Sequence, residues 1–302
     1  MRKSRALGTF YVFLSAVVFG FTPVLANLSY AGGNNGVNMA FLRALIPLPA
    51  LMLMGRVMSP GYRATGRQIR TGALLGCLNF GCSLMLYSSY SHIPVGIATT
   101  LHFLYPLFVM LYHVVRFRER PGAAKWTGLL MGVGGAALLI ELGEGGLSPV
   151  GMMLALVSGV LFAAYIIILQ NEAKNPLPLY RLMTVTSIAG GVLCALVGAL
   201  LGKLTFSLTP QAWMYAAAAA LMVSIGGSAV FQAGVRLVGD TDAAIYSLLE
   251  PLTSIVFGLM LLGEMLTARK IISCALILTG LLITALADRG KRSAETKTPE
   301  TE

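Results

Sequence analysis

Three ionisable side chains lie inside long apolar stretches, where a charge is costly. Glu250 lies in SLLEPLTSIVFGLMLLGEM, Arg43 in MAFLRALIPLPALMLM and His102 in IATTLHFLYPLFVML. A charge at the centre of a bilayer costs about 3 kcal/mol on insertion scales, so each group needs a partner or a neutral form. A carboxylate can bind a cation or carry a proton, a guanidinium can hold a carboxylate through two parallel hydrogen bonds, and an imidazole can donate, accept or titrate.

Each of these groups also has a structural interpretation. Glu250 could be a protonated or hydrogen-bonded carboxyl that fixes its helix to a neighbour. Arg43 lies about six residues from the end of its stretch, roughly 9 Å at 1.5 Å per residue, so its guanidinium could snorkel to the lipid headgroups. The sequence favours snorkelling or a structural ion pair for Arg43. His102 could be a satisfied structural histidine, as single histidines in apolar helices commonly are.

Uncharged polar and aromatic side chains in other apolar stretches could complete a binding cavity. Amide and hydroxyl groups there can face a ligand or join helices, and tyrosine faces form an apolar wall that accepts cations. The candidates are Tyr87, Tyr105, Tyr246, Asn79, Ser83 and Gln232. Tyr90 is close enough to a helix end to belong to the interfacial aromatic belt. No metal-ligand cluster, nucleotide fingerprint or nucleophile–base set is found, so we predict no metal, no other cofactor and no enzymatic activity.

The apolar stretches define the fold class. Of the 302 residues, 56% are hydrophobic and 11% charged, whereas soluble domains contain about 25% charged residues. Because a bilayer-spanning helix needs about 20 residues, we predict an all-α integral membrane protein with ten transmembrane helices. The predicted spans are 7–29, 37–58, 69–90, 94–116, 124–141, 149–170, 179–202, 210–237, 241–263 and 268–287. The first stretch could be a cleaved signal peptide, but its length favours a retained helix.

The positive charges predict the orientation of these helices. With the N-terminus inside, most of the 22 Lys and Arg residues fall in cytoplasmic segments, and only Lys203, Arg269 and Lys270 fall in outer ones. Both termini are therefore expected in the cytoplasm, and the polar tail 289–302 is expected to be disordered. The net charge of +10 then reflects topology, so we expect no nucleic-acid partner.

Prolines interrupt two of the predicted helices near their centres. Pro106 and Pro251 lie within the fourth and ninth spans, where each removes the hydrogen bond to the carbonyl four residues earlier and bends the helix. In lipid the freed carbonyls need partners, so they should face protein or a watery cavity. A static kink and a moving hinge both fit this pattern, and Pro106 and Pro251 are our hinge candidates.

The sequence also repeats itself. A shift of 145 residues places LYPL (104–107) on LEPL (249–252) and Glu119 on Glu264. We therefore predict two homologous halves, 1–141 and 149–288, with five spans each. Because five is odd, the halves must be inverted relative to each other, an arrangement found in many secondary transporters with a site near the midplane.

The segments that carry this repeat resemble a known family. LHFLYPLFVMLYHVVRFRERPGAAKWTGLLMGVGGAALLI (101–140) and LLEPLTSIVFGLMLLGEMLTARKIISCALILTGLLI (248–283) are similar to the first and second EamA domains of the drug/metabolite transporter superfamily. In length and general appearance the chain resembles the YddG-type amino-acid exporters. The resemblance implies a bacterial inner-membrane protein with a central cavity, and fifth and tenth helices that pack together at the side. The halves differ where Tyr105 replaces Glu250, so any role of the carboxylate is asymmetric.

These features predict a secondary transporter that exports small neutral or zwitterionic metabolites by alternating access. Few charges are available to the cavity, which favours amino acids, neutral or aromatic, with Arg43 on the carboxylate and Glu250 or tyrosine faces on the ammonium. The alternative is an exporter of drugs or toxic lipophilic metabolites. An intramembrane enzyme and a scaffold without transport activity fit less well. The expected partners are a small-molecule substrate and the lipid bilayer, and a monomer is compatible with the sequence.

Overall fold

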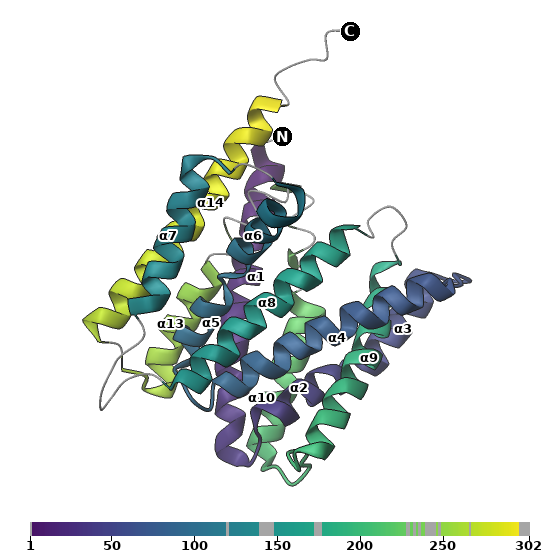
Figure 1. The fold of residues 1–302 in the computed structure, drawn as a ribbon. Coiled ribbons are helices and arrows are strands. Elements are labelled where there is room, and N and C mark those ends of the chain that lie inside the picture. The colour runs from purple at the N-terminus through teal and green to yellow at the C-terminus, as the bar shows by residue number, and fades with distance from the viewer. Residues whose placement is uncertain are drawn as a thin grey trace.

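The protein is an all-helical bundle in the residues that its structure, a computed structural model, describes (Figure 1). These residues are 2–118, 121–138, 148–171, 177–227, 230–231, 234, 237–238, 246, 249–265 and 267–295. Seven helical segments in this part of the chain are long and apolar enough to cross a membrane. The protein is therefore a multi-span membrane protein.

The described helices follow the predicted apolar stretches, while the end of the predicted span 210–237 and the start of the span 241–263 lie largely outside the described residues. They are α1 (Arg2–Leu28), α2 (Gly36–Leu45), α3 (Leu48–Met58), α4 (Gly66–Ser89), α5 (Val95–His102), α6 (Tyr105–Phe117), α7 (Ala123–Leu138), α8 (Pro149–Asn171), α9 (Leu179–Leu200), α10 (Pro210–Leu221), α13 (Leu249–Leu262) and α14 (Ala268–Glu295). A short 3₁₀ helix, η1 (Ser29–Gly32), follows α1, and a π-helical segment, η2 (Met222–Gly227), follows α10. The last helix continues past Arg289 to Glu295, through the first part of the tail that we expected to be disordered.

Two predicted spans are divided by proline. The span 37–58 is divided between α2 and α3, with Pro47 at the cap of α3, and the span 94–116 is divided between α5 and α6. We expected Pro106 inside one continuous bent helix, but it lies in the first turn of α6. Proline is tolerated in a first turn, because the backbone N–H that it lacks would have no helical partner there. Pro23 does lie within a continuous helix, α1.

Helices α7 and α14 pack side by side along their length (Figure 1). Their contact depends on glycines, since a Cβ at Gly128 would lie 2.6 Å from the carbonyl oxygen of Gly280, and one at Gly280 would lie 2.7 Å from that of Gly128. Small residues of this kind let helix backbones approach closely in membranes. The packing of the fifth and tenth predicted helices is thus confirmed.

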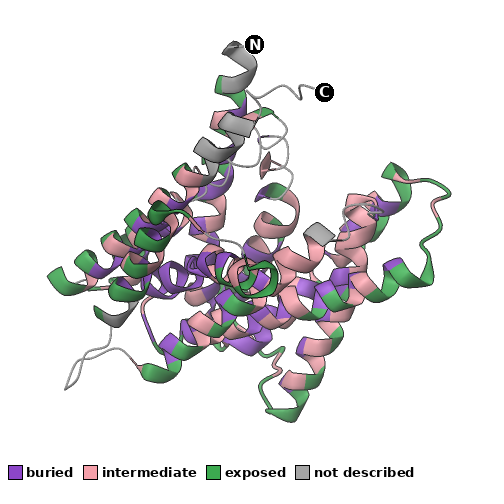
Figure 2. Cartoon of the chain, turned by 45° about the horizontal axis from the view of Figure 1, so that its top comes forward, coloured by how far each residue is buried: buried purple, intermediate pink, exposed green. Residues whose placement is uncertain are grey.

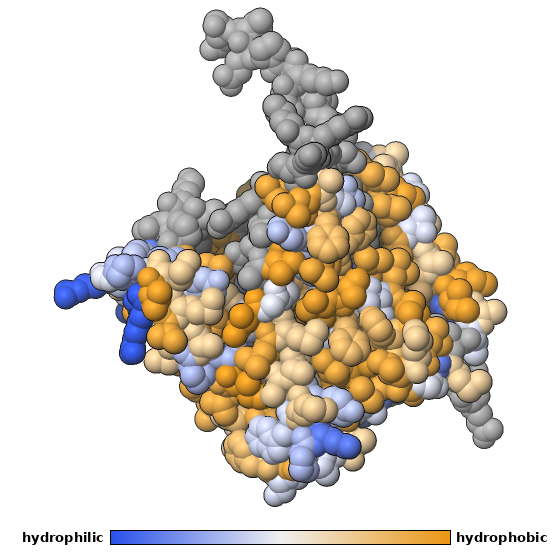
Figure 3. Space-filling model, turned by 180° about the vertical axis from the view of Figure 1, so that it is seen from behind, coloured by the Kyte–Doolittle hydropathy of each residue, from blue (hydrophilic) through white to orange (hydrophobic). Residues whose placement is uncertain are grey.

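The middle of the bundle is buried and its outer face is apolar. Every residue of α5 is buried, and Figure 2 shows buried positions concentrated around the bundle centre. Large apolar side chains remain exposed on the outside, including Leu53, Val115, Leu130 and Met260. Figure 3 shows an apolar surface over most of one face. This pattern is that of a protein surrounded by lipid, and it leaves polar side chains to gather around an internal cavity.

Candidate functional site

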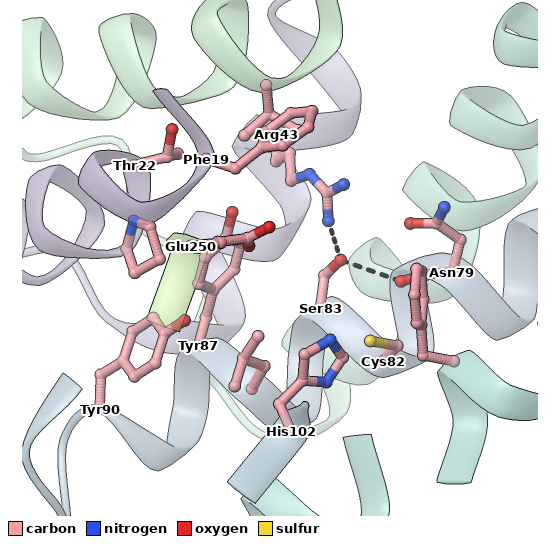
Figure 4. A pocket seen from close by; sticks show the side chains of 14 residues that line it. Phe19, Thr22, Arg43, Asn79, Cys82, Ser83, Tyr87, Tyr90, His102 and Glu250 are labelled. Carbon is pink, nitrogen blue, oxygen red and sulfur yellow. Dashed lines mark hydrogen bonds between the residues drawn. The ribbon is translucent and has the colours of Figure 1, made fainter. Parts of the chain in front are cut away.

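A cavity of about 230 Å³ lies between α1, α2, α4, α5, α8, η2 and α13 (Figure 4). Its walls are Phe19, Thr22, Pro23, Arg43, Asn79, Cys82, Ser83, Leu86, Tyr87, Tyr90, His102, Phe162, Val223 and Glu250. No residue of α7 or α14 lines it. Six of the predicted site residues meet here, although they come from four helices.

Helix α4 supplies one complete wall of the cavity. Asn79, Ser83 and Tyr87 follow each other at intervals of four residues, and Tyr90 continues the same face. Residues three and four apart lie on one side of an α-helix, so a single orientation of α4 brings all of them to the cavity. The helix begins with a capping box, in which Thr65 and Gln68 satisfy each other's backbone N–H groups.

Arg43 extends into the cavity from the last turn of α2. Its Nη1 donates a hydrogen bond to Ser83 Oγ, and Ser83 donates in turn to the carbonyl oxygen of Asn79 at 2.9 Å. The guanidinium lies over the ring of Phe80, 5.4 Å from its centroid. The structure thus places Arg43 at an internal site, whereas the sequence favoured a snorkelling or paired arginine. The sequence could not predict where the Arg43 side chain points, because the position of a residue along the chain does not show which neighbouring helix covers that face of α2.

The guanidinium of Arg43 keeps unused donors. Its Nε is buried and has no hydrogen-bond partner, and Nη1 is the one nitrogen with a partner in the described part of the chain. Leaving a buried charged donor unsatisfied costs more than the 1–3 kcal/mol typical of a neutral group. Such a group is suited to a ligand with paired acceptor oxygens, such as a carboxylate.

His102 is the last residue of α5 and lies at the break before α6. Its Nδ1 is 3.0 Å from Ser158 Oγ in α8, and Ser158 donates to the carbonyl oxygen of Ala155 at 2.6 Å. The carbonyl that Pro106 leaves without a helical donor, that of His102, lies against Gly159, where a Cβ would be 2.9 Å away. Glycine at this position therefore permits α8 to pack closely on the break between α5 and α6.

Glu250 reaches the cavity from the first described turn of α13 (Figure 4). Within the described residues its carboxylate forms no hydrogen bond, although the charge of Arg43 is near enough to act on it. Its backbone carbonyl lies against α1, because a Cβ at Gly20 would be 2.5 Å from that oxygen. The carboxylate is thus held at the cavity wall and stays open to a ligand.

Two of the predicted site residues lie away from the cavity wall, and a third is not among the described residues. Tyr105 stands behind the wall, with its ring 4.8 Å from that of Phe162 and 5.9 Å from that of His102. Tyr246 packs on Phe13, with 5.1 Å between ring centroids, and does not line the cavity. Gln232 lies outside the described residues. The two hinge candidates differ in burial, since Pro251 is buried in α13 and Pro106 is half-buried at the start of α6.

Several wall residues were not among the predicted site residues. Phe19 and Phe162 both line the cavity, and they occupy matching positions in the segments SAVVFG (15–20) and SGVLFA (158–163). The internal repeat was the signal that could have identified this pair. Tyr90, which we assigned to the interfacial belt, is 5% exposed, and its buried hydroxyl has no partner in the described part of the chain.

The described residues contain no group of three or more His, Cys, Asp or Glu side chains that could hold a metal ion. Cys82 and Cys194 are buried free thiols, and so is Cys274. The wall chemistry therefore consists of one guanidinium, one carboxylate, one imidazole, the thiol of Cys82 and a set of aromatic, aliphatic, hydroxyl and amide groups. This combination is suited to binding a ligand by hydrogen bonds and charge.

Comparison with known proteins gives a consistent family assignment. The model of the EamA-like transporter family matches residues 6–141 and again residues 149–286. An uncharacterized transporter of Synechocystis, sll1319, is 24% identical over 90% of this chain and 91% of its own length. The threonine/homoserine exporter RhtA of Escherichia coli K12 is 28% identical over 72% of this chain and 70% of its own. A solved structure titled "Crystal structure of protein" shares the fold, with a TM-score of 0.64, 20% identity and coverage of 93% of this chain and 98% of that one.

Proposed function

The chain belongs to the EamA-like transporter family, and we propose that it exports small neutral or zwitterionic metabolites, in the first place neutral or aromatic amino acids. Transport would occur by alternating access between two inverted five-helix halves around the cavity. The matching positions of Phe19 and Phe162 in the cavity wall support a site shared by the two halves. The bias of positive charge supports cytoplasmic termini, and the bacterial transporters among the relatives agree with our assignment to a bacterial inner membrane.

The observation that carries this proposal is that Arg43 and Glu250 line the same buried cavity. A free amino acid carries a carboxylate and an ammonium group. The unused donors of Arg43 would hold the carboxylate, and Glu250 would attract the ammonium. Phe19 and Phe162 would then contact the substrate side chain, which fits neutral and aromatic residues.

The size of the cavity favours a small metabolite over a drug. Its volume of about 230 Å³ is below the roughly 300–1,000 Å³ of pockets that hold drug-sized ligands. The relative RhtA is named an exporter of threonine and homoserine, which are small zwitterions. Export of lipophilic drugs is therefore the second candidate, supported by the aromatic part of the wall alone.

Flux in proteoliposomes tests the proposal. The purified chain is reconstituted and loaded with radiolabelled neutral, aromatic, hydroxylated, basic or acidic amino acids, with and without a pH gradient. We expect saturable efflux of neutral amino acids by the wild type and a large loss in Arg43→Gln and Glu250→Gln. The pH gradient tests separately whether transport is coupled to protons.

The controls decide between the two candidate substrates. Variants are compared only after gel filtration in detergent shows that they are folded and monodisperse. Parent-level transport of amino acids by both variants would contradict the proposed roles of Arg43 and Glu250. Movement of lipophilic cations without movement of any amino acid would replace the proposal with the drug exporter.

A further inference from the structure

We propose that His102 presents its Nε2 atom as a hydrogen-bond acceptor to the ammonium group of the transported amino acid, and that Ser158 is the positioning residue that sets this tautomer. The inference rests on the proposed function, because it takes the cavity as the substrate site. It adds a second ammonium contact beside Glu250 and assigns a task to a serine that does not line the cavity.

The tautomer follows from the protons of Ser158. A hydroxyl carries one proton, and the oxygen of Ser158 lies 2.6 Å from the carbonyl oxygen of Ala155. Two oxygens at this separation repel unless a proton lies between them, so Ser158 donates to Ala155. It must then accept from His102 Nδ1, which is 3.0 Å away. In a neutral imidazole with its proton on Nδ1, Nε2 is an acceptor.

The free acceptor belongs to a buried side chain at the cavity wall. His102 is 8% exposed and lines the cavity, where Figure 4 shows it below Ser83 and beside Cys82. Its Nε2 has no partner in the described part of the chain. Buried polar groups normally have a hydrogen-bond partner. A donor brought by the substrate would supply one.

The surroundings of His102 favour an ammonium group as this donor. A lone pair repels a carboxylate, and a charged donor forms the stronger hydrogen bond. The Phe162 ring lies 5.3 Å from the His102 ring and also lines the cavity, so it can offer its face to a cation. An ammonium group has three donors, so it can contact Glu250 and His102 together.

The chain contains a matched control for Ser158. Ser15 occupies the corresponding position in the first half, is buried, and donates to the carbonyl of Val12 at 2.8 Å. Ser158 is likewise buried and bonded to a carbonyl three residues earlier. Ser158 contacts a histidine, and Ser15 has no such contact in the described structure. Alanine at either position removes the same intrahelical bond, but only Ser158→Ala frees the imidazole.

The test measures KM and kcat for efflux of a neutral amino acid from proteoliposomes. It also measures competition by the 2-hydroxy acid with the same side chain, in which a hydroxyl replaces the ammonium. His102→Gln places a side-chain oxygen near the position of Nε2, whereas His102→Asn keeps a group near Nδ1 and loses the acceptor. We expect KM near the wild-type value for His102→Gln. For His102→Asn we expect a roughly tenfold higher KM, a similar kcat and weaker discrimination against the hydroxy acid.

Ser158→Ala should raise KM, as His102→Asn does, and Ser15→Ala should leave KM unchanged. Equal KM and equal discrimination in His102→Gln and His102→Asn would overturn the assignment of His102. If neither His102 variant folds, the serine pair decides, and equal KM values for Ser158→Ala and Ser15→Ala would overturn it. Absence of amino-acid efflux from the wild type would instead overturn the proposed function, so the two failures are distinguishable.

Discussion

Ser254 in α13 donates a hydrogen bond of 2.8 Å to the carbonyl oxygen of Gly20 in α1. Both residues are at the contact between the first and second halves of the sequence, and Ser254 is fully buried. The contact is close because Gly20 has no side chain. It holds the second turn of α13 against α1, one turn after Glu250.

Substitution of Gly20 should therefore disturb the site. A Cβ there would lie 2.5 Å from the carbonyl oxygen of Glu250 and 2.6 Å from Cβ of Thr253. Overpacking of this kind costs about 1–3 kcal/mol, so Gly20→Ala should unfold at a lower temperature in detergent and transport more slowly. Gly134→Ala is the control, because nothing lies within 4 Å of its Cβ position. Equal melting temperatures for the two variants would contradict the close contact of α1 with α13.

Arginine at position 43 should be needed for its shape as well as its charge. Lysine keeps the charge but lacks the planar donor pair that matches a carboxylate. Loss of a hydrogen bond to a charged group costs about 1.5–3 kcal/mol, or roughly 10- to 100-fold in affinity. Arg43→Lys should thus raise KM for amino-acid efflux by about that factor. A KM equal to that of the wild type would show that Arg43 holds Ser83 and not the substrate.

The stability of the protein should depend on pH through the ionisation of Glu264. This residue lies between α13 and α14, and its Oε1 accepts from the Val95 N–H at 2.5 Å. The carboxylate thereby caps the N-terminus of α5. Burial raises the pKa of Glu264, while the N–H groups of Val95 and Gly96 act in the opposite direction.

The sign of the effect follows from this raised pKa. The pKa of glutamate in the unfolded chain is about 4.3. When the pKa in the folded protein is higher than this, the group stabilises the folded protein fully at a pH below the unfolded-state pKa. This stabilisation is lost as the pH rises through the folded-state pKa. The melting temperature of the wild type relative to Glu264→Gln should therefore fall between pH 4 and pH 8. A relative melting temperature that rises over this range would show that the hydrogen bonds to the carboxylate outweigh its burial.

Cys82 offers a check of the cavity that does not depend on transport rates. Its side chain lines the cavity, whereas Cys194 and Cys274 are buried elsewhere and Cys77 is exposed on the outside of α4. In a Cys77→Ala background, a small thiol reagent should modify Cys82 slowly, because buried thiols form little thiolate. A transported amino acid should slow the reaction further. Mass spectrometry identifies the modified residue, and a rate unchanged by saturating substrate would place the substrate elsewhere.

The sequence alone supports the membrane class and the positions of the helices. Lipid offers no hydrogen-bond partners, so lipid-exposed crossings must be helical, and their apolar stretches can be read directly from the sequence. Because a charge in lipid costs free energy, the sequence also identified Glu250, Arg43 and His102 as side chains that need a partner or a function. The helix breaks were harder to predict. Pro106, for example, lies in the first turn of α6, whereas we expected it within a bent helix.

Only the tertiary structure decided which of these side chains meet. The direction of a side chain around its helix depends on how that helix is rotated against its neighbours, which the local sequence does not specify. That rotation brings Arg43 to Ser83 and His102 to Ser158, and it leaves Tyr246 on Phe13, away from the cavity. The sequence by itself thus determined which residues could do chemistry, and long-range packing determined which of them share one cavity.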